Sequence, residues 1–285
     1  MRVSGLGHAI VAAGTRADPV PHLKLRKMRK FMSVQDDLAV IATGLALASA
    51  GLAGVALGER TGLYLAVGYL PFERSDIEAL LKDSVVDGGF SMSAFASGGY
   101  CAVNPLLTFR CLPNMAAYHI SANFDVQGPY FVTYPGPGQF YVALQEAIAA
   151  LESGRVDVAL VAGVAHQRNF LVEHHFSRID APVEPEGLAD AAGCLVLETA
   201  AHSAARAAPA RGRLLDLDVS YSPHDPFSES PAFAETFDGT PTPVEAGSAS
   251  LPARLSQAAA GGNRRLVHDL RSRDGIRGRS AWELL

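Results

Sequence analysis

The clearest structural signal in the chain is the run Ile148-Ala-Ala-Leu-Glu-Ser-Gly-Arg-Val-Asp-Val-Ala-Leu-Val-Ala-Gly163. Its first part continues a helical pattern that begins near Gly138, and Ser153-Gly154 is a typical helix stop. The residues from Arg155 to Gly163 are mostly apolar and include β-branched side chains, which favours a buried central strand. A helix that leads directly into such a strand is typical of a layered α/β protein.

The same alternation of helices and strands extends in both directions from this run. Ser33 precedes Asp36 and Asp37 in the pattern of a helix N-terminus, and the predicted helix ends near Gly51. Ser75 and Glu78 have the spacing of a capping box. The pattern also predicts strands over 62–68, 130–134, 192–198 and 214–220, extended residues over 118–124, and helices over 75–82, 104–111 (105–115 at its longest), 138–153 and 199–208.

These elements predict an α/β fold whose mixed sheet is covered by helices on both faces. After Ser222 the pattern dissolves, and residues 223–252 are rich in Pro, Ser, Thr and acidic side chains, which indicates a loop. The tail from Ala253 has room for one or two helices at most, and His268 is interpreted as a surface helix residue. We therefore expect an ordered domain over residues 1–222 and a shortened or irregular segment over 223–285.

Composition narrows the class of protein. Of 285 residues, 48% are hydrophobic and 19% are charged, which is the balance of a compact soluble protein. A formal net charge of −5 gives no general reason to expect nucleic acid binding. The uncharged stretch from Leu38 to Leu57 is mostly Ala and Gly, so we interpret it as a buried helix and not as a membrane span. With no secretory leader visible, we expect a cytoplasmic protein.

Neither the cysteines nor the histidines form a metal-binding pattern. Cys101, Cys111 and Cys194 lack the spacing of a zinc site or a disulfide framework, and we interpret each as a small buried side chain. His174 and His175 are adjacent, and adjacent side chains on one element point apart. The Gly5-Leu-Gly7 segment lacks the third glycine of a dinucleotide fingerprint. We expect no metal and no cofactor.

Several of these segments, taken in order, resemble the N-terminal half of a β-ketoacyl synthase of the thiolase superfamily. The resemblance is carried by Arg29-Lys-Phe31-Met, Asn104-Pro105, Pro113-Asn-Met-Ala-Ala117, Gly128-Pro129, the run over 148–163 and Leu195-Val-Leu-Glu198. It covers about residues 1–220. It implies a thiolase-like layered α-β-α fold, with a ketosynthase N-terminal half and a shortened C-terminal part.

The resemblance also shows where a nucleophile should lie. In that family a cysteine stands at a helix N-terminus, seven residues before the Ile or Leu of an Ala-Ile or Ala-Leu pair. Counting back from Leu144 leads to Pro137, and residues 133–139 contain no cysteine. Proline has no thiol that could form an acyl-enzyme. The family's two later histidines, in His-Gly-Thr and Asn-His contexts, have no match either, so we predict no catalytic residue.

Members of this family without the cysteine are chain length factors, which pair with an active ketosynthase. This chain most resembles the short factors of aryl polyene and other highly reducing type II polyketide systems. Such factors usually carry glutamine at the lost position, whereas Gln139 lies two residues beyond Pro137. The resemblance implies three partners: a ketosynthase subunit in a heterodimer, an acyl carrier protein, and a growing acyl chain in a tunnel along the interface. It implies no nucleic acid and no membrane.

The resemblance assigns residues to each of these roles. The side chains that would set where the tunnel ends are Leu106, Phe109, Leu112 and Met115. The residues that would contact the partner subunit across the two-fold axis are Tyr118, Phe124, Tyr130, Phe131 and Tyr134. The basic residues that would dock the acidic carrier protein are Arg26, Lys27, Arg29 and Lys30. The structural alternative for the four tunnel residues is a stripe that packs into the core. The structural alternative for the four basic residues is the solvated start of a helix.

The alternative function is an independent acyltransferase or decarboxylase of the thiolase superfamily that uses a group other than cysteine. Near Pro137 the available side chains are Thr133, Tyr134 and Gln139. None of them is paired in sequence with a recognisable histidine base. A relic with a purely structural role is the third hypothesis.

Overall fold

The computed structural model describes the whole chain except residues 71, 180–181, 224–232 and 243. Within this part, ten strands form one mixed sheet in the order β10-β9-β11-β12-β8-β1-β7-β6-β2-β5. They are β1 (Arg2–Val11), β2 (Thr61–Val67), β5 (Tyr130–Thr133), β6 (Val158–His166), β7 (Asp190–Glu198), β8 (Gly212–Tyr221), β9 (Ala234–Phe237), β10 (Thr240–Pro241), β11 (Arg265–Arg271) and β12 (Ile276–Leu284). A separate two-stranded hairpin consists of β3 (Val85–Val86) and β4 (Gly89–Phe90).

The helices of the described residues connect these strands. The α-helices are α1 (Val34–Ser49), α2 (Arg74–Lys82), α3 (Met92–Ser97), α4 (Leu107–Cys111), α5 (Met115–Phe124), α6 (Gly138–Glu152), α7 (Phe170–Phe176), α8 (Ala200–Ala205) and α9 (Ser250–Ala260). The 3₁₀-helices are η1 (Val20–His22), η2 (Arg26–Phe31), η3 (Gly99–Ala102), η4 (Pro185–Gly187) and η5 (Gly247–Ala249).

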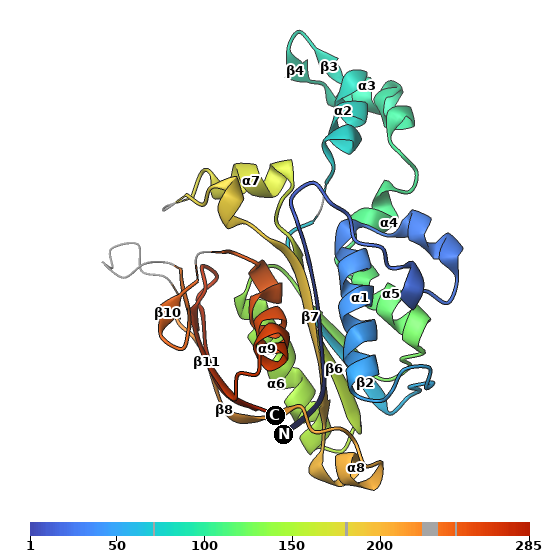
Figure 1. Ribbon diagram of the computed structural model, residues 1–285. Coiled ribbons are helices and arrows are strands. Elements are labelled where there is room, and N and C mark those ends of the chain that lie inside the picture. Colours follow the sequence, from blue (N-terminus) through green and yellow to red (C-terminus); the bar gives the residue numbers. More distant parts are fainter. Residues whose placement is uncertain (71, 180–181, 224–232, 243) are drawn as a thin grey trace.

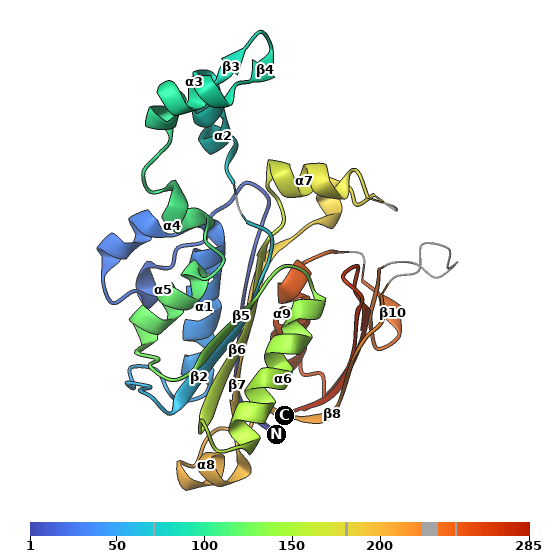
Figure 2. The ribbon, with the colours of Figure 1, turned by 180° about the vertical axis from the view of Figure 1, so that it is seen from behind.

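The sheet folds back on itself and produces four layers, as Figures 1 and 2 show. α1 and α5 cover one face of the N-terminal strands, and α6 and α9 cover the other face. The strands β8, β12 and β11 then cover α6 and α9 from outside. The two halves of the sheet meet where β1 pairs with β8 over only two residues of each strand. The predicted α/β fold with a mixed sheet is confirmed.

The two halves of the sheet share one strand order. The five strands of each half can be numbered by their order in the sequence. Across the sheet both halves then follow the order third, second, fourth, fifth, first, which is β5-β2-β6-β7-β1 in the N-terminal half and β10-β9-β11-β12-β8 in the C-terminal half. The C-terminal half is far shorter, and its β9 runs antiparallel to β11 where the corresponding β2 runs parallel to β6. The predicted loop over 223–252 contains the strands β9 and β10 and the start of α9, so that prediction was wrong. The tail from Ala253 contains β11 and β12 beside α9, so the prediction of helices alone was wrong as well.

The outer face of the C-terminal half is polar. Along β12 the inward residues are buried, whereas Arg277 and Arg279 point outward and are exposed. Arg279 pairs with Asp269 of β11 at 3.5 Å, and Arg213 of β8 pairs with Glu283 at 2.6 Å. Antiparallel strands can expose one face to water in this way. Among the described residues no helix covers this face, and its charges make one unnecessary.

α1 begins where the sequence predicts. The Ser33 hydroxyl accepts a hydrogen bond from the backbone N–H of Asp36 at 3.3 Å, and the Asp36 carboxylate accepts one from the N–H of Ser33 at 2.6 Å. A Cβ added to Gly5 or Gly7 would lie 2.2 or 2.3 Å from carbonyl oxygens of α1. The glycines of β1 thus let the helix approach the sheet closely.

No helix of the described residues has the length and apolarity to span a membrane.

Several local predictions were wrong. The cap of α2 pairs Glu73 with Asp76, not Ser75 with Glu78. Residues 118–124 are helical, as part of α5, and the helix predicted over 105–115 is interrupted between α4 and α5. Among the cysteines only Cys194 is buried, and Cys101 is exposed.

His268 is also placed differently from the prediction. It lies on β11 and is only 1% exposed, facing α6. Its Nδ1 lies 2.7 Å from the Tyr141 hydroxyl of α6, and its Nε2 lies 2.9 Å from Glu235 of β9. Burial raises the pKa of Tyr141, which keeps the hydroxyl protonated. The network ties α6 to the C-terminal half of the sheet.

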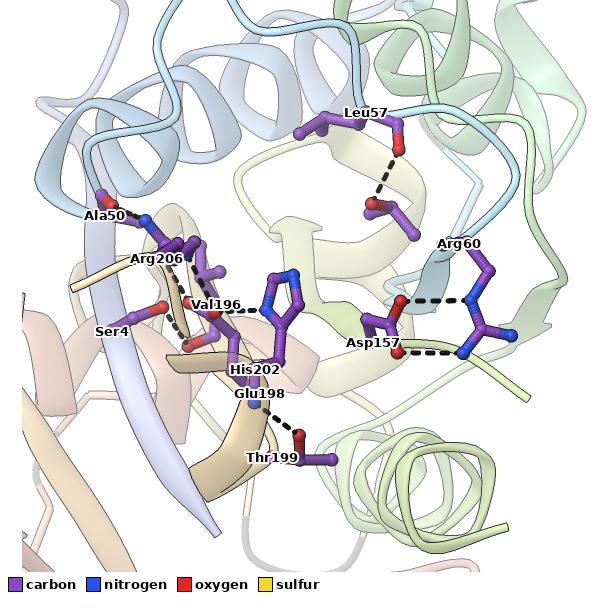
Figure 3. A network of polar contacts seen from close by, with 11 residues as sticks. Ser4, Ala50, Leu57, Arg60, Asp157, Val196, Glu198, Thr199, His202 and Arg206 are labelled. Atoms are coloured by element: carbon purple, nitrogen blue, oxygen red, sulfur yellow. Dashed lines mark hydrogen bonds and ion pairs between the residues drawn. The ribbon is translucent and has the colours of Figure 1, made fainter. Parts of the chain in front are cut away.

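A second buried network lies at the end of β7 and is drawn in Figure 3. The Glu198 carboxylate accepts hydrogen bonds from the guanidinium of Arg206, through Nε at 2.8 Å and through Nη2, and lies 2.7 Å from His202 Nδ1. Arg206 also donates to the carbonyl of Ala50, at the end of α1, at 2.9 Å. Burial alone would raise the pKa of Glu198, but the hydrogen bonds from Arg206, Ser4 and His202 outweigh it, and the pKa lies below its usual value.

We expect Arg206→Ala to lower the free energy of unfolding by about 3 kcal/mol, because it leaves a buried carboxylate without its main partner. Chemical denaturation at pH 7 measures this. The difference should shrink as the pH falls from about 4.3, the pKa of an unfolded glutamate, through the lower folded pKa, because the stabilising ion pair is then lost from the wild type as well. Arg60→Ala, which removes the exposed Arg60–Asp157 pair of Figure 3, is the control and should have little effect.

Candidate functional site

The site predicted at Pro137 is a sharp turn from strand to helix. β5 ends at Thr133, and α6 begins at Gly138 with Pro137 as its N-cap residue. Gly136 has a φ of +104°, a conformation that favours glycine. The Thr133 hydroxyl donates a hydrogen bond to the Gln139 carbonyl at 3.0 Å, which closes the turn. The positive end of α6 therefore faces this turn.

A pocket of about 210 Å³ opens beside the turn. It is lined by residues from five parts of the chain: Gly68 and Tyr69 after β2, Tyr134 to Pro137 and Gln139 at the turn, Gln167 after β6, Glu245 and Gly247 before α9, and Ser272 to Asp274 between β11 and β12. The described residues of its lining include no cysteine and no histidine. It therefore offers no thiol for an acyl-enzyme.

A carboxylate of the chain itself faces the start of α6. A Cβ added to Gly138 would lie 3.1 Å from Asp274 Oδ1, and one added to Gly136 would lie 3.9 Å from Asp274 Oδ2. The Asp274 carboxylate accepts hydrogen bonds from the Gln139 amide at 2.8 Å and from the Ser272 hydroxyl. A negative charge at this end of a helix is stabilised. Asp274 thus lies where the helix would otherwise favour a thiolate.

The deeper side of the pocket is held by an ion pair. Arg273 donates to both carboxylate oxygens of Glu245, at 3.1 and 3.0 Å. Its guanidinium lies 4.4 Å from the ring centroid of Phe233 and 5.2 Å from that of Phe176. Burial raises the pKa of Glu245, and Arg273 acts in the opposite direction. The cation is therefore neutralised inside the chain.

The remaining polar side chains beside the pocket include one hydroxyl–imidazole pair, Tyr69 with His175. Burial, together with the nearby Glu245, raises the pKa of Tyr69, so its hydroxyl is a poor nucleophile. His175 Nε2 lies 3.3 Å from that hydroxyl, and burial lowers the pKa of the histidine. Gln167 is almost completely buried, and its Oε1 makes no hydrogen bond within the described part of the chain. No observation here favours an independent acyltransferase or decarboxylase.

The four side chains assigned to the tunnel lie in and around α4. Leu106 precedes α4, Phe109 lies within it, Leu112 follows it and Met115 starts α5. Phe109 is 45% exposed, and Leu112 is exposed to a similar degree, while Met115 is buried. They therefore do not share one helix face. The Phe109 ring meets the Phe31 ring of η2 edge to face, at 5.9 Å between centroids.

Of the residues assigned to the partner contact, Tyr118 and Phe124 lie on α5, Tyr130 and Phe131 lie on β5, and Tyr134 follows β5. Tyr118, Tyr130 and Tyr134 are exposed, and Tyr130 is the most exposed at 68%. Phe124 and Phe131 are half-buried and pack against the two cores. β5 pairs with β2 alone, so it is an edge strand. A pocket of about 270 Å³ between α5 and β5 is lined by Tyr118, Tyr130 and neighbouring residues.

The basic residues assigned to carrier-protein docking form the short helix η2. Arg26, Lys27 and Lys30 are exposed. Arg29 is half-buried and pairs with Asp18 at 3.0 Å. The contact between Phe31 and Phe109 places this basic helix next to α4.

The sequence prediction missed Tyr69, Gln167, Glu245, Arg273 and Asp274, because they come from segments with no signal in common. The Asp274-Gly275 pair is a typical hairpin turn, and it was the one available sign that this loop joins two strands. Cys194, on β7, is buried, and burial raises its pKa to about 12. Among the described residues no group of three or more His, Cys, Asp or Glu side chains could hold a metal ion.

A family model described as "Beta-ketoacyl synthase, N-terminal domain" matches residues 9–189. A search of curated proteins found no match. The chain is similar to a solved structure described as "AntDE:AntF (apo): type II PKS acyl-carrier protein in complex with its ketosynthase bound to the hexaketide". The match covers 100% of this chain and 99% of that chain, with a TM-score of 0.72 and 13% sequence identity.

Two further solved structures are similar. One is the ishigamide ketosynthase/chain length factor, with a TM-score of 0.66 and 15% sequence identity. The match covers 100% of this chain and 98% of that chain. The other is a β-ketoacyl synthase from Burkholderia phymatum STM815, with a TM-score of 0.57 and 19% sequence identity. The match covers 77% of this chain and 64% of that chain. At these identities the likeness is one of fold, and the fold is thiolase-like.

We expect Pro137→Cys to create a thiol that reacts slowly, because the Asp274 carboxylate opposes the lowering of its pKa by α6. Adding Asp274→Asn should raise the rate of alkylation at residue 137 roughly threefold at pH 7, the effect of about 0.7 kcal/mol at a helix end. Peptide mass mapping after iodoacetamide treatment separates this site from the native cysteines. Equal rates for the single and double variants would contradict a role for Asp274, and Asp274→Asn alone is the unlabelled control.

Proposed function

The chain belongs to the β-ketoacyl synthase family, and we propose that within this family it is a non-catalytic chain length factor. In this role it pairs with an active ketosynthase and shapes the tunnel that holds the growing acyl chain. The observation that carries the proposal is the turn at Pro137, where a residue without a thiol precedes α6 and Asp274 faces the helix end. The short factors of aryl polyene and other highly reducing type II polyketide systems are the proposed subtype.

The chemistry of condensation requires a partner. A ketosynthase holds the acyl chain as a thioester and joins it to a carbon nucleophile formed from a malonyl group. Such a reaction needs a thiolate and groups that bind and polarise the malonyl unit. Among the residues that the structure describes, those lining the pocket beside Pro137 include neither a cysteine nor a histidine. The bond-forming steps therefore belong to a second subunit with an intact site.

The names of two similar structures support the choice of partners. One contains an acyl carrier protein with its ketosynthase, and the other is a ketosynthase/chain length factor. Each is matched over nearly the full length of its own chain. We propose by analogy that this chain binds a ketosynthase subunit and an acyl carrier protein, and that it works in the cytoplasm.

The edge strand β5 is the proposed centre of the heterodimer. Its backbone groups on one side have no partner strand, and Tyr130 is exposed beside them. An exposed, apolar sheet edge favours pairing with another chain. Tyr118, Phe124, Phe131 and Tyr134 surround this edge and extend the proposed contact over α5 and the start of α6. A division at residue 222 remains part of the proposal, although the family match ends earlier, at residue 189.

The tunnel would end near α4. Phe109 and Leu112 expose large apolar side chains on the isolated chain, and an acyl chain beside them would remove that surface from water. Leu106 and Met115 flank them. η2 carries Arg26, Lys27, Arg29 and Lys30 and touches α4 through Phe31, so a carrier protein docked there would lie close to the proposed tunnel.

We expect Phe109→Ala to lengthen the polyketide product, because it removes a bulky side chain from the proposed end of the tunnel. The measurement is product mass from a reconstituted system of ketosynthase, carrier protein and this chain. Leu215→Ala, on the outer face of β8, is the control and should leave product length unchanged. Unchanged length with Phe109→Ala would contradict the tunnel role, and full activity without this chain would contradict the proposed function.

We expect the charge reversal Arg26→Glu/Lys27→Glu to weaken binding of the acidic carrier protein at least fivefold at low salt, with the difference shrinking as salt is added. Titration of the heterodimer with carrier protein at two salt concentrations measures this. Arg277→Glu/Arg279→Glu, on the outer face of β12, is the matched control. Equal affinity for wild type and the η2 variant at low salt would show that η2 is only a solvated helix.

A further inference from the structure

Residues 72–106 form an arm that projects from the rest of the molecule, as Figures 1 and 2 show. The arm leaves the body after β2 and contains α2, the hairpin β3–β4, α3 and η3. It returns to the body at α4, which leads into α5. Its main contacts are internal, between α2 and η3 and between α3 and η3.

The arm has no hydrophobic core. Only Asp76, Ser84 and Gly99 are buried within residues 72–106, and none of them is a large apolar residue. Several large apolar side chains instead face outward, with Met92 66% exposed, Tyr100 56% exposed and Phe90 50% exposed. Others, such as Ile77, Leu80 and Phe95, are half-buried. Leu81, Val85 and Val86 are exposed as well. A soluble monomer rarely gathers exposed apolar side chains in this way without a binding partner.

The elements of the arm are too short to be stable without tertiary contacts. α2 has nine residues and α3 has six, whereas isolated helices below about 12 residues are marginal in water. The hairpin has two residues in each strand, and an isolated hairpin is also marginal. Its internal packing is slight, such as the contact of the Phe90 and Phe95 rings at 6.0 Å between centroids. The arm therefore gains most of its stability when another surface covers it.

The charge pattern limits what that surface can be. Residues 88–109 contain no Asp, Glu, Lys or Arg. An acidic carrier protein or an anionic lipid surface would favour basic residues here, and these lie on η2 instead. Within the arm the charged residues lie over 73–87, five of them acidic and two basic. The uncharged, apolar second part, residues 88–106, matches the desolvated centre of a protein–protein interface.

The position of the arm identifies the occupant. The chain returns from the arm through Phe109 and Leu112 to α5, whose exposed Tyr118 lines the pocket shared with Tyr130 of β5. The exposed apolar residues thus continue from the arm to the free sheet edge. We propose that the arm is a second docking element, which lies against the ketosynthase subunit that pairs at β5. This inference rests on the proposed function and adds a contact outside the sheet edge.

The test compares arm and control variants in complex formation. We expect Phe90→Asp/Met92→Asp to leave the thermal unfolding midpoint of the isolated chain unchanged, because neither side chain belongs to a core, and to weaken binding of the ketosynthase at least tenfold. Leu215→Asp, an equally exposed apolar position on β8, should bind as the wild type does. The probes are the ketosynthases of the same source that retain the cysteine at the elbow, titrated and followed by size-exclusion chromatography with light scattering.

Cys101 supplies an independent readout without mutation. It lies on η3 in the arm and is exposed. Its rate of alkylation by a maleimide, followed by peptide mass mapping, should fall at least tenfold when the ketosynthase binds. Buried Cys194 should stay unlabelled in both states.

The possible failures are distinguishable. Wild-type affinity of the arm variant together with an unprotected Cys101, in a complex that still forms, would overturn the arm proposal and leave the proposed function intact. Failure of the wild-type chain to bind any elbow-cysteine ketosynthase would overturn the proposed function. Self-association that the arm variant abolishes, or binding of the arm to phosphatidylcholine vesicles, would replace the ketosynthase with a second copy or a lipid and also overturn the arm proposal.

Discussion

The burial of α6 and α9 between the two halves of one continuous sheet is the constraint on which the rest of the structure depends. The approach is close: a Cβ on Gly163 of β6 would lie 2.0 Å from the Ser248 carbonyl, and one on Gly193 of β7 would lie 2.2 Å from the Ala253 nitrogen. Small residues at these positions let the start of α9 rest on the sheet. The same packing fixes the N-terminus of α6, and with it the turn at Pro137, against the loop that carries Asp274.

The N-terminal half could be predicted from sequence because its signals are local and strong. Ser33 caps α1, and the run from Arg155 leads into a strand that is buried along its whole length. α5 was missed because Tyr118, Ile120 and Phe124 have the side chains of a strand, while packing against α1 makes the segment helical. β11 and β12 were missed although the buried residues Leu266, His268 and Leu270 of β11 alternate with the less buried Val267 and Asp269. The alternation was not recognised because one of the buried residues, His268, is polar. Its hydrogen-bond partners, Tyr141 and Glu235, lie far away in the sequence and could not be inferred from the local pattern.

The candidate site divides in the same way. The loss of the nucleophile depends on counting within one segment, so the sequence was sufficient to place Pro137 at the start of α6. The Asp274 contact could not be predicted, since it joins residues more than 130 positions apart. Arg273 and Glu245 are likewise paired only by the fold. Beside the turn at Pro137 the described residues thus form internal hydrogen bonds and ion pairs, between Asp274 and Gln139 and between Arg273 and Glu245.

The two ends of the sheet differ in a way that bears on pairing with another chain. At one end β5 presents an unpaired edge four residues long. At the other, within the described residues, the sheet finishes in the two-residue strand β10, which contains Pro241 and so lacks one of its backbone donors. A strand from another chain can form backbone hydrogen bonds with β5. At β10 few backbone groups are available for such pairing. Within the described residues, pairing of this sheet with a strand of another chain is therefore favoured at the β5 end over the β10 end.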